Sequence, residues 1–141
     1  MTDINTISKE YLNFIFVGLD HGINSIRESG GPMVTFVMSV TADKKQLTRI
    51  VTDRLEDGPT EAEKFIRNLQ PTPRLALIAY DGFATVKGER NDAVIVRSFD
   101  SAEETGLVFA QRYILSPEKK ELKEHGNSAL MGHEKNILKG N

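Results

Sequence analysis

The chain has 141 residues, of which 39% are hydrophobic and 27% charged, and its formal net charge is -2. This length suits one domain that buries a core without staples, and the balanced charge excludes the basic surface that non-specific nucleic-acid binding requires. The chain has no cysteine, which excludes disulfides, thiolate metal sites and cysteine nucleophiles. No stretch reaches the ~20 apolar residues of a membrane span, and the N-terminus lacks a signal-peptide pattern. We therefore expect a soluble, cytoplasmic protein.

The N-terminal region predicts a helix over residues 9–28. Ser8 is a suitable N-cap, and Gly30 supplies the left-handed conformation that ends many helices. Two glycines, Gly18 and Gly22, weaken the prediction because glycine disfavours the helix interior. Apolar residues at three- and four-residue spacing nevertheless give one continuous apolar face: Leu12, Ile15, Leu19, Ile23 and Ile26.

The middle of the chain alternates between segments typical of strands and one segment typical of a helix. Residues 33–41 and 46–51 are rich in β-branched residues and predict a hairpin. Thr60 and Glu63 then have the spacing of a capping box, which predicts a short amphipathic helix. Residues 74–86, 92–99 and 106–115 predict a three-stranded meander, and glycine at Gly82 allows a bend or bulge after Asp81.

These elements follow the order α-β-β-α-β-β-β. We expect residues 1–116 to form one α+β domain, with a five-stranded antiparallel sheet and both helices on one face. Ser116 and Pro117 could start another helix, but the following residues are almost all charged. Residues 117–141 are therefore interpreted as a charged short helix followed by a mobile tail.

The predicted strands are apolar on both faces. In residues 74–86, for example, Leu75 and Leu77 point one way, while Ala76, Ile78 and Tyr80 point the other. Two helices can cover only one face of five strands, so the second face needs another cover. The alternatives are the C-terminal segment and a second copy of the chain. We expect a homodimer formed through the meander face or its edge.

Asp81, Glu89, Arg90 and Asp92 form the strongest polar cluster, around the turn between the third and fourth predicted strands. Carboxylates beside an arginine can perform acid–base chemistry or hold a cation. The alternative is that the acidic residues favour the turn conformation and that the arginine makes surface ion pairs. No motif indicates a nucleotide, a metal or another cofactor, so none is expected.

Several short segments resemble a small family of uncharacterised bacterial proteins. They are residues 30–32, 80–82, 88–93 and 109–113 (GGP, YDG, GERNDA and FAQRY). The resemblance spans most of residues 30–115 and implies no known activity. The order of elements also resembles roadblock-type scaffold modules, which pair through their sheets.

Two functional hypotheses follow from the sequence. The first is a non-enzymatic interaction or scaffold module that homodimerises through its sheet. The alternative is a small enzyme or small-ligand-binding protein that uses the acidic residues Asp81, Glu89, Arg90 and Asp92. A deep pocket lined by these residues would favour the second hypothesis, and an exposed turn far from any concavity would discard it.

Overall fold

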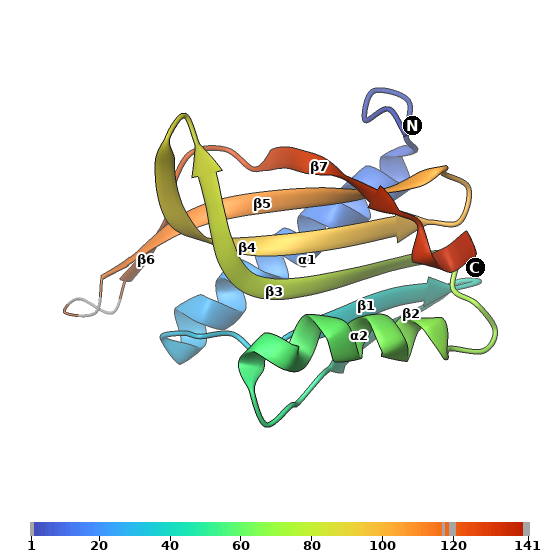
Figure 1. Cartoon of the computed structure of the whole chain (residues 1–141), viewed down its shortest axis with the longest axis horizontal. Coiled ribbons are helices and arrows are strands. Elements are labelled where there is room, and N and C mark those ends of the chain that lie inside the picture. Colours follow the sequence, from blue (N-terminus) through green and yellow to red (C-terminus); the bar gives the residue numbers. More distant parts are fainter. Residues whose placement is uncertain (1, 117, 119–120, 140–141) are drawn as a thin grey trace.

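The computed structural model describes residues 2–116, 118 and 121–139. Within these ranges the chain is an α+β domain with two α-helices and one curled antiparallel sheet (Figure 1). No helix in the described ranges is long and apolar enough to cross a membrane. The helices are α1 (Lys9–Ser29) and α2 (Gly58–Arg67), and the short 3-10 helices are η1 (Leu55–Asp57) and η2 (Ile137–Lys139). The strands are β1 (Phe36–Thr41), β2 (Lys44–Arg49), β3 (Leu75–Val86), β4 (Glu89–Asp100), β5 (Thr105–Ser116), β6 (Glu121–Glu124) and β7 (Ala129–Lys135).

The predicted antiparallel sheet is confirmed, but it has two more strands than expected. Its order is β2-β1-β3-β4-β5-β6, and β7 also pairs with β5. β6 lies along the second half of β5, whereas β7 lies along the first half. Within the segment interpreted as a helix and mobile tail, residues 121–124 and 129–135 therefore form strands. The helix start expected at Pro117 lies outside the described residues.

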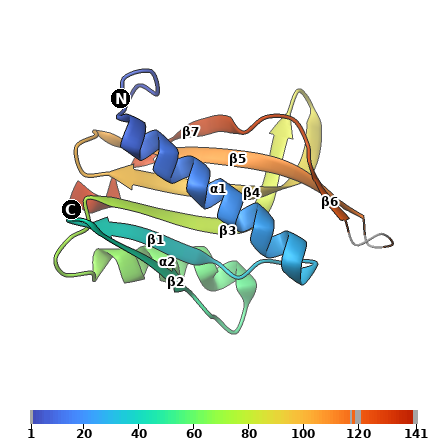
Figure 2. The ribbon, with the colours of Figure 1, turned by 180° about the vertical axis from the view of Figure 1, so that it is seen from behind.

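α1 covers one face of the sheet, as the view from behind shows (Figure 2). The side chain of Ser8 accepts a hydrogen bond from the Tyr11 backbone N–H, and Gly30 ends the helix with φ 80°, so both predicted caps are confirmed. A Cβ atom on Gly18 would lie 2.6 Å from Leu77, and one on Gly22 would lie 2.6 Å from Val94. The two glycines therefore allow the helix backbone to approach the central strands closely.

α2 covers the opposite face, so the expectation that both helices share one face is wrong. Ala62 and Ile66 of α2 pack against Ile78 of β3, whose neighbour Leu77 packs under α1. Leu138 of η2 joins the α2 cluster. Apolar residues on both faces of the strands are thus explained within one chain, because each face has its own helix.

The capping box predicted for α2 is also wrong. The helix begins at Gly58, two residues before Thr60, with Pro59 in its first turn and no side-chain cap. The Glu63 carboxylate lies beside Arg67 and Arg97 instead of returning to the helix start. Two charged partners therefore fix Glu63, and proline in the first turn needs no backbone donor.

The far halves of β3 and β4 curl away from the rest of the sheet (Figure 1). Of the bend or bulge that Gly82 was expected to allow, the bulge is not present, since the β3–β4 register is continuous from Leu75 to Val86. The curl instead brings small side chains together in a separate cluster with Ile95, which is 6% exposed. The other buried members of that cluster are Ala84, Ala93 and Ala110.

Candidate functional site

A cavity of about 790 Å3 lies where the curled part of β3 leaves β1. Residues 30–35, which connect α1 to β1, form one wall. η1 and the start of α2 form a second wall, and β3, β4 and β5 supply the rest. The polar lining side chains are Thr35, Glu56, Tyr80, Asp81, Asp92 and Tyr113. The cavity therefore combines apolar walls with a few polar groups, which is usual for ligand sites.

Strand alternation places Asp81 and Asp92 on the same face of the sheet. Leu77 of β3 faces α1, and Asp81, four residues later, points to the same side beyond the end of that helix. Asp92 lies directly opposite Phe83 in the β3–β4 register, so the two carboxylates are diagonal neighbours. Two of the four predicted site residues therefore line the cavity.

The Asp81 carboxylate accepts two hydrogen bonds. The Tyr113 hydroxyl donates to Oδ1 over 2.7 Å, and the Met33 backbone N–H donates to Oδ2 over 3.4 Å. Burial raises the pKa of Asp81, while these hydrogen bonds oppose the rise and the negative charge of Asp92 adds to it. Burial and the adjacent Asp81 also raise the pKa of Tyr113, so its hydroxyl remains a proton donor at neutral pH.

Arg90 lies outside the cavity wall. Its guanidinium carbon is 4.1 Å from the centre of the Phe83 ring, which is a cation–π contact. Phe83 is 60% exposed and lines the cavity, so the arginine covers an aromatic side chain that would otherwise face solvent. Neither Asp81 nor Asp92 forms an ion pair with a basic side chain of the described residues.

Glu89, the fourth predicted residue, belongs to a different cluster. One of its carboxylate oxygens, Oε1, lies 2.6 Å from Nε2 of His125 and 3.3 Å from the Arg112 guanidinium. These contacts join the start of β4 to β5 and to the residue that follows β6. Glu89 therefore ties the C-terminal segment to the sheet and does not line the cavity.

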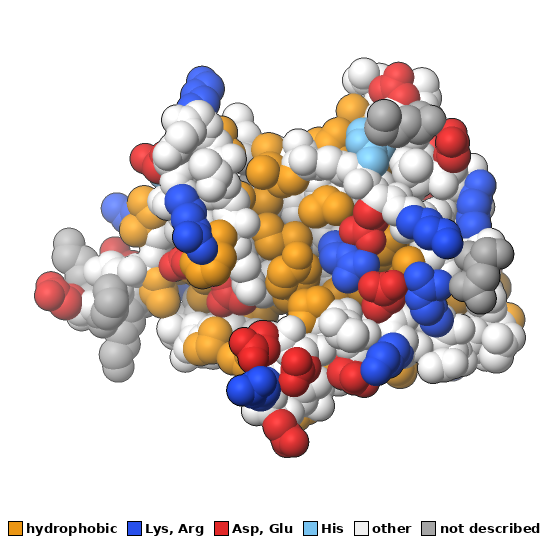
Figure 3. All heavy atoms as spheres, viewed as in Figure 1, with side chains coloured by type: hydrophobic (Ala, Val, Ile, Leu, Met, Phe, Trp, Pro, Cys, Tyr) orange, Lys and Arg blue, Asp and Glu red, His pale blue; other side chains and the backbone are white. Residues whose placement is uncertain are grey.

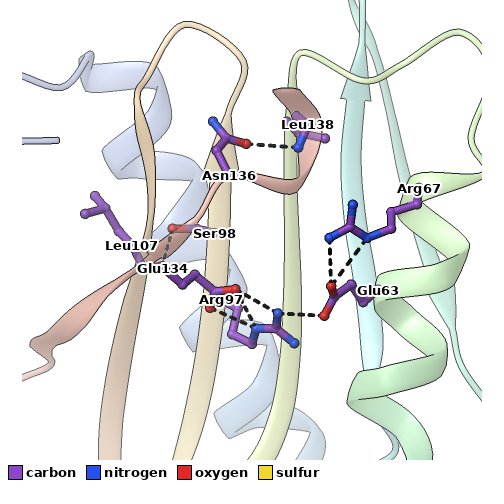
Figure 4. Close-up of polar contacts among 8 residues, drawn as sticks. All are labelled: Glu63, Arg67, Arg97, Ser98, Leu107, Glu134, Asn136 and Leu138. Atoms are coloured by element: carbon purple, nitrogen blue, oxygen red, sulfur yellow. Dashed lines mark hydrogen bonds and ion pairs between the residues drawn. The ribbon is translucent and has the colours of Figure 1, made fainter. Parts of the chain in front are cut away.

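A second polar cluster lies on the α2 face of the sheet (Figure 4). Arg97 of β4 contacts Glu134 of β7 at 2.7 Å and Glu63 of α2 at 2.9 Å. Burial opposes the charged arginine, but the two carboxylates outweigh it and raise the pKa of Arg97. The hydrogen bond from Arg97 lowers the pKa of Glu63. Because these three side chains satisfy one another, the cluster stabilises the contact between three elements.

A hollow lined by hydrophobic side chains separates this charged cluster from the β3–β4 hairpin (Figure 3). Tyr80 and Val108 are partly buried and pack on the alanine-rich cluster below the curl. Tyr80 also lines the cavity beside Asp81. Tyr80 therefore belongs both to that cluster and to the cavity wall.

Sequence reasoning missed Tyr113 and the connection from α1 to β1 as parts of this site. Tyr113 is only 5% exposed, so its place in a strand of mostly apolar residues is typical of the core. Its hydrogen bond to Asp81 leaves no separate pattern in the sequence. Gly30 was interpreted as a helix cap, and it both caps α1 and lines the cavity.

Comparisons with protein-family models, with curated proteins and with solved structures gave no match.

Proposed function

We propose that this protein binds a small organic cation in the cavity beside Asp81. The observation that carries the proposal is the composition of the cavity wall. Carboxylates of Asp81 and Asp92 converge on a space with apolar walls, and no lysine, arginine or histidine lines it among the described residues. A ligand with an amino group and an apolar body has the matching chemistry.

The position of the site relative to α1 supports a positive ligand. Gly30 and Gly31, at the C-terminal end of this helix, line the cavity. A helix C-terminus carries a partial negative charge that favours cations. Glu56 adds a third carboxylate to the wall, although Arg54 also pairs with it at 3.3 Å. These negative groups favour a cation, against the positive charge of Arg90, which lies over the lining residue Phe83.

Burial of Asp81 gives a second reason to expect a cation. An ionised carboxylate away from water is unfavourable unless a partner is present, which is why the pKa of Asp81 is raised. The Tyr113 hydroxyl supplies one hydrogen bond but no charge. A bound ammonium group would supply the missing positive charge. It would thereby offset part of the free-energy cost of keeping Asp81 ionised, and this gain favours binding.

Homodimerisation stays a prediction, but its premise has changed. It depended on a sheet face that the helices of one chain leave open, and α2 with η2 now covers much of that face. β6 and β7 occupy the β5 edge that was a candidate interface. Size-exclusion chromatography with light scattering at micromolar concentration is the direct test, and a clean monomer would exclude the homodimer.

Three matched probes test the binding proposal: benzylamine, benzyl alcohol and benzoate. They share one ring and differ in charge. We expect benzylamine to bind most tightly and benzoate least, with nuclear magnetic resonance (NMR) shift changes at the amides of residues 80–83. The double variant Asp81→Asn, Asp92→Asn should lose the preference for benzylamine. A matched control, Asp43→Asn in the exposed β1–β2 turn, should keep it.

Equal binding of the three probes, or shift changes confined to surfaces away from the cavity, would contradict the proposal. Retention of the benzylamine preference in the double variant would contradict it as well, provided that the melting temperature shows the variant to be folded.

A further inference from the structure

The cavity lies along an open edge of β3. This strand runs from Leu75 to Val86, but β1 pairs only with residues 75–79. From Tyr80 onward, no strand of the described ranges pairs with β3 on that side, whereas β4 pairs with its full length on the other. Open edges offer unpaired backbone donors and acceptors to an added strand.

The register identifies the backbone groups that face this edge. Lys87 and Gly88 both have positive φ and form a two-residue turn, so Val86 and Glu89 are the hydrogen-bonded pair that closes the hairpin. Counting back from Val86, every second residue of β3 hydrogen-bonds to β4, and Gly82 and Ala84 are among these residues. The backbone N–H and C=O groups of Asp81 and Phe83 therefore point to the open edge.

No other described residue hydrogen-bonds to the backbone of Asp81 or Phe83. Both residues also line the cavity. The connection at residues 30–35 does not continue β1 along this edge, because Met33 instead contacts the Asp81 side chain. Among the described residues, no strand therefore occupies the position next to β3 beyond Ala79.

The size of the cavity matches a short strand. One strand residue occupies roughly 160 Å3, given a rise of ~3.3 Å, a strand spacing of ~4.8 Å and a layer thickness of ~10 Å. A cavity of about 790 Å3 therefore has the volume of about five such residues. This volume is larger than a ligand with one amino group and one ring, such as benzylamine, requires.

We propose that the natural ligand is an extended peptide segment that adds to the open edge of β3 and places a lysine or arginine side chain against Asp81 and Asp92. This inference rests on the proposed function, because the cationic side chain occupies the same site as benzylamine. The backbone groups of Asp81 and Phe83 supply the main-chain hydrogen bonds of strand addition, and the carboxylates supply selectivity.

Charge favours a basic segment of another protein over a second copy of this chain. Two copies joined edge to edge at β3 would bring together two pairs of the same carboxylates, and like charges facing each other across strands are destabilising. The C-terminal strands of the same chain are not free to occupy the edge either, because β6 and β7 already pair with β5.

The test uses two pools of acetylated, amidated hexapeptides that are random except at the third position. One pool carries lysine there and the other glutamate. We expect the lysine pool to shift the amide signals of Asp81 and Phe83 and to slow their hydrogen exchange. The glutamate pool should bind at least about tenfold more weakly, a difference in binding free energy of about 1.4 kcal/mol.

Backbone methylation of the peptides tests strand addition separately from charge. Two further lysine pools carry backbone N-methyl groups at every second residue: one pool at the odd positions and the other at the even positions, which gives the two phases. Because alternate peptide N–H groups face β3, one phase should lose binding and the other should keep it. If both phases bind as tightly as the parent pool, strand addition is excluded, whether or not the lysine is recognised.

A pair of protein variants provides the matched control. Phe83→Pro removes the N–H that faces the edge without removing a hydrogen bond to β4, whereas Phe83→Ala keeps that N–H and removes the ring. We expect Phe83→Pro to weaken lysine-pool binding at least about fivefold relative to Phe83→Ala. Equal binding by the two folded variants would overturn the proposal, and the methylated pools decide the question if Phe83→Pro does not fold.

The outcomes separate this inference from the proposed function. If benzylamine binds at the cavity but the lysine pool does not shift Asp81 and Phe83, the peptide inference fails and the cation site stands. If neither probe binds, both fail. If the two amide signals instead depend on protein concentration and light scattering shows a dimer, the edge serves a second copy and the peptide inference is overturned.

Discussion

The hydroxyl of Tyr113 donates a 2.7 Å hydrogen bond to Oδ1 of Asp81 from a strand that is not its neighbour in the sheet. Tyr113 belongs to β5 and Asp81 to β3, so the tyrosine side chain reaches across β4. The contact holds a partly buried carboxylate at the edge of the cavity. It also makes the ionisation of Asp81 sensitive to a residue 32 positions away in the sequence.

Tyr113→Phe should raise the pKa of Asp81 further. Burial already raises this pKa, and the tyrosine hydrogen bond partly opposes the rise because it stabilises the charged carboxylate. Carboxyl NMR titration measures the change directly. Tyr80→Phe is the matched control, since Tyr80 lines the same cavity without a hydrogen bond to Asp81. A lower pKa in Tyr113→Phe would show that the hydroxyl does not stabilise the carboxylate.

Asp81→Asn should raise the melting temperature at pH 7. The folded-state pKa of Asp81 lies above its unfolded value near 3.8, so its favourable contribution is fully present below that value. It is lost as pH rises through the folded-state pKa. Asparagine cannot ionise, so the variant should gain most at neutral pH and little below pH 3.8.

Melting curves between pH 3 and pH 8 test this pH dependence. Asp43→Asn, which removes an exposed carboxylate, should show no comparable gain. A variant that loses stability at pH 7 would mean that the ionised Asp81 is better stabilised than its burial indicates.

Arg97→Gln should destabilise the fold by about 2 kcal/mol, because Glu134 loses its ion pair and Glu63 keeps only Arg67. Urea unfolding measures the loss. Lys64→Gln removes an exposed ion pair with Glu61 and should cost no more than about 0.5 kcal/mol. Similar losses for the two variants would mean that the Arg97 cluster is merely a surface ion pair.

Hydrogen exchange should alternate along the free half of β3. The amides of Asp81 and Phe83 should exchange quickly, whereas those of Gly82 and Ala84, bonded to β4, should exchange slowly. The amide of Leu77, which lies in the part of β3 between β1 and β4, provides the protected reference. Uniform protection from residue 80 to residue 85 would show that another segment of the chain pairs with this edge in solution.

Gly22→Ala should destabilise the protein by about 1–2 kcal/mol. The new methyl group would lie 2.6 Å from Cγ1 of Val94, a fully buried side chain with few rotamers. Better helix propensity offsets about 1 kcal/mol of the overpacking. Asn13→Ala, at an exposed position of the same helix, should be slightly stabilising. If Gly22→Ala stabilises equally, α1 does not approach the sheet as closely as described.

Local signals predicted α1 well, because Ser8 and Gly30 are both strong boundary residues. They did not predict β7, because it is an outer strand with alternating exposure and polar residues. Glu134 in that strand is balanced by Arg97, which lies 37 positions earlier in the sequence. Because this partner lies far outside β7, the seven residues of the strand could not reveal it.

The sequence also could not reveal which side of the sheet each helix covers. Apolar residues on both faces of β3 indicated two covers, but the apolar stripe of a helix does not show which face of the sheet it covers. The site was predictable only in part for a related reason. Asp81 and Asp92 are close in sequence and share a hairpin, whereas Tyr113 joins them through the register of three strands.

The contacts of β7 have a consequence for synthesis on the ribosome. Nε2 of His133 lies 2.7 Å from the carbonyl oxygen of Thr2, and Asn136 donates hydrogen bonds to the carbonyls of Asp100 and Glu103. A nascent chain can pair β1 with β3 and dock α1 early. The segment before α1 can already bind β5, because Thr2 hydrogen-bonds to Thr105, but the first half of the β5 edge stays open until residues 129–136 have emerged. During that interval the exposed β5 edge is open to aggregation through the sheet.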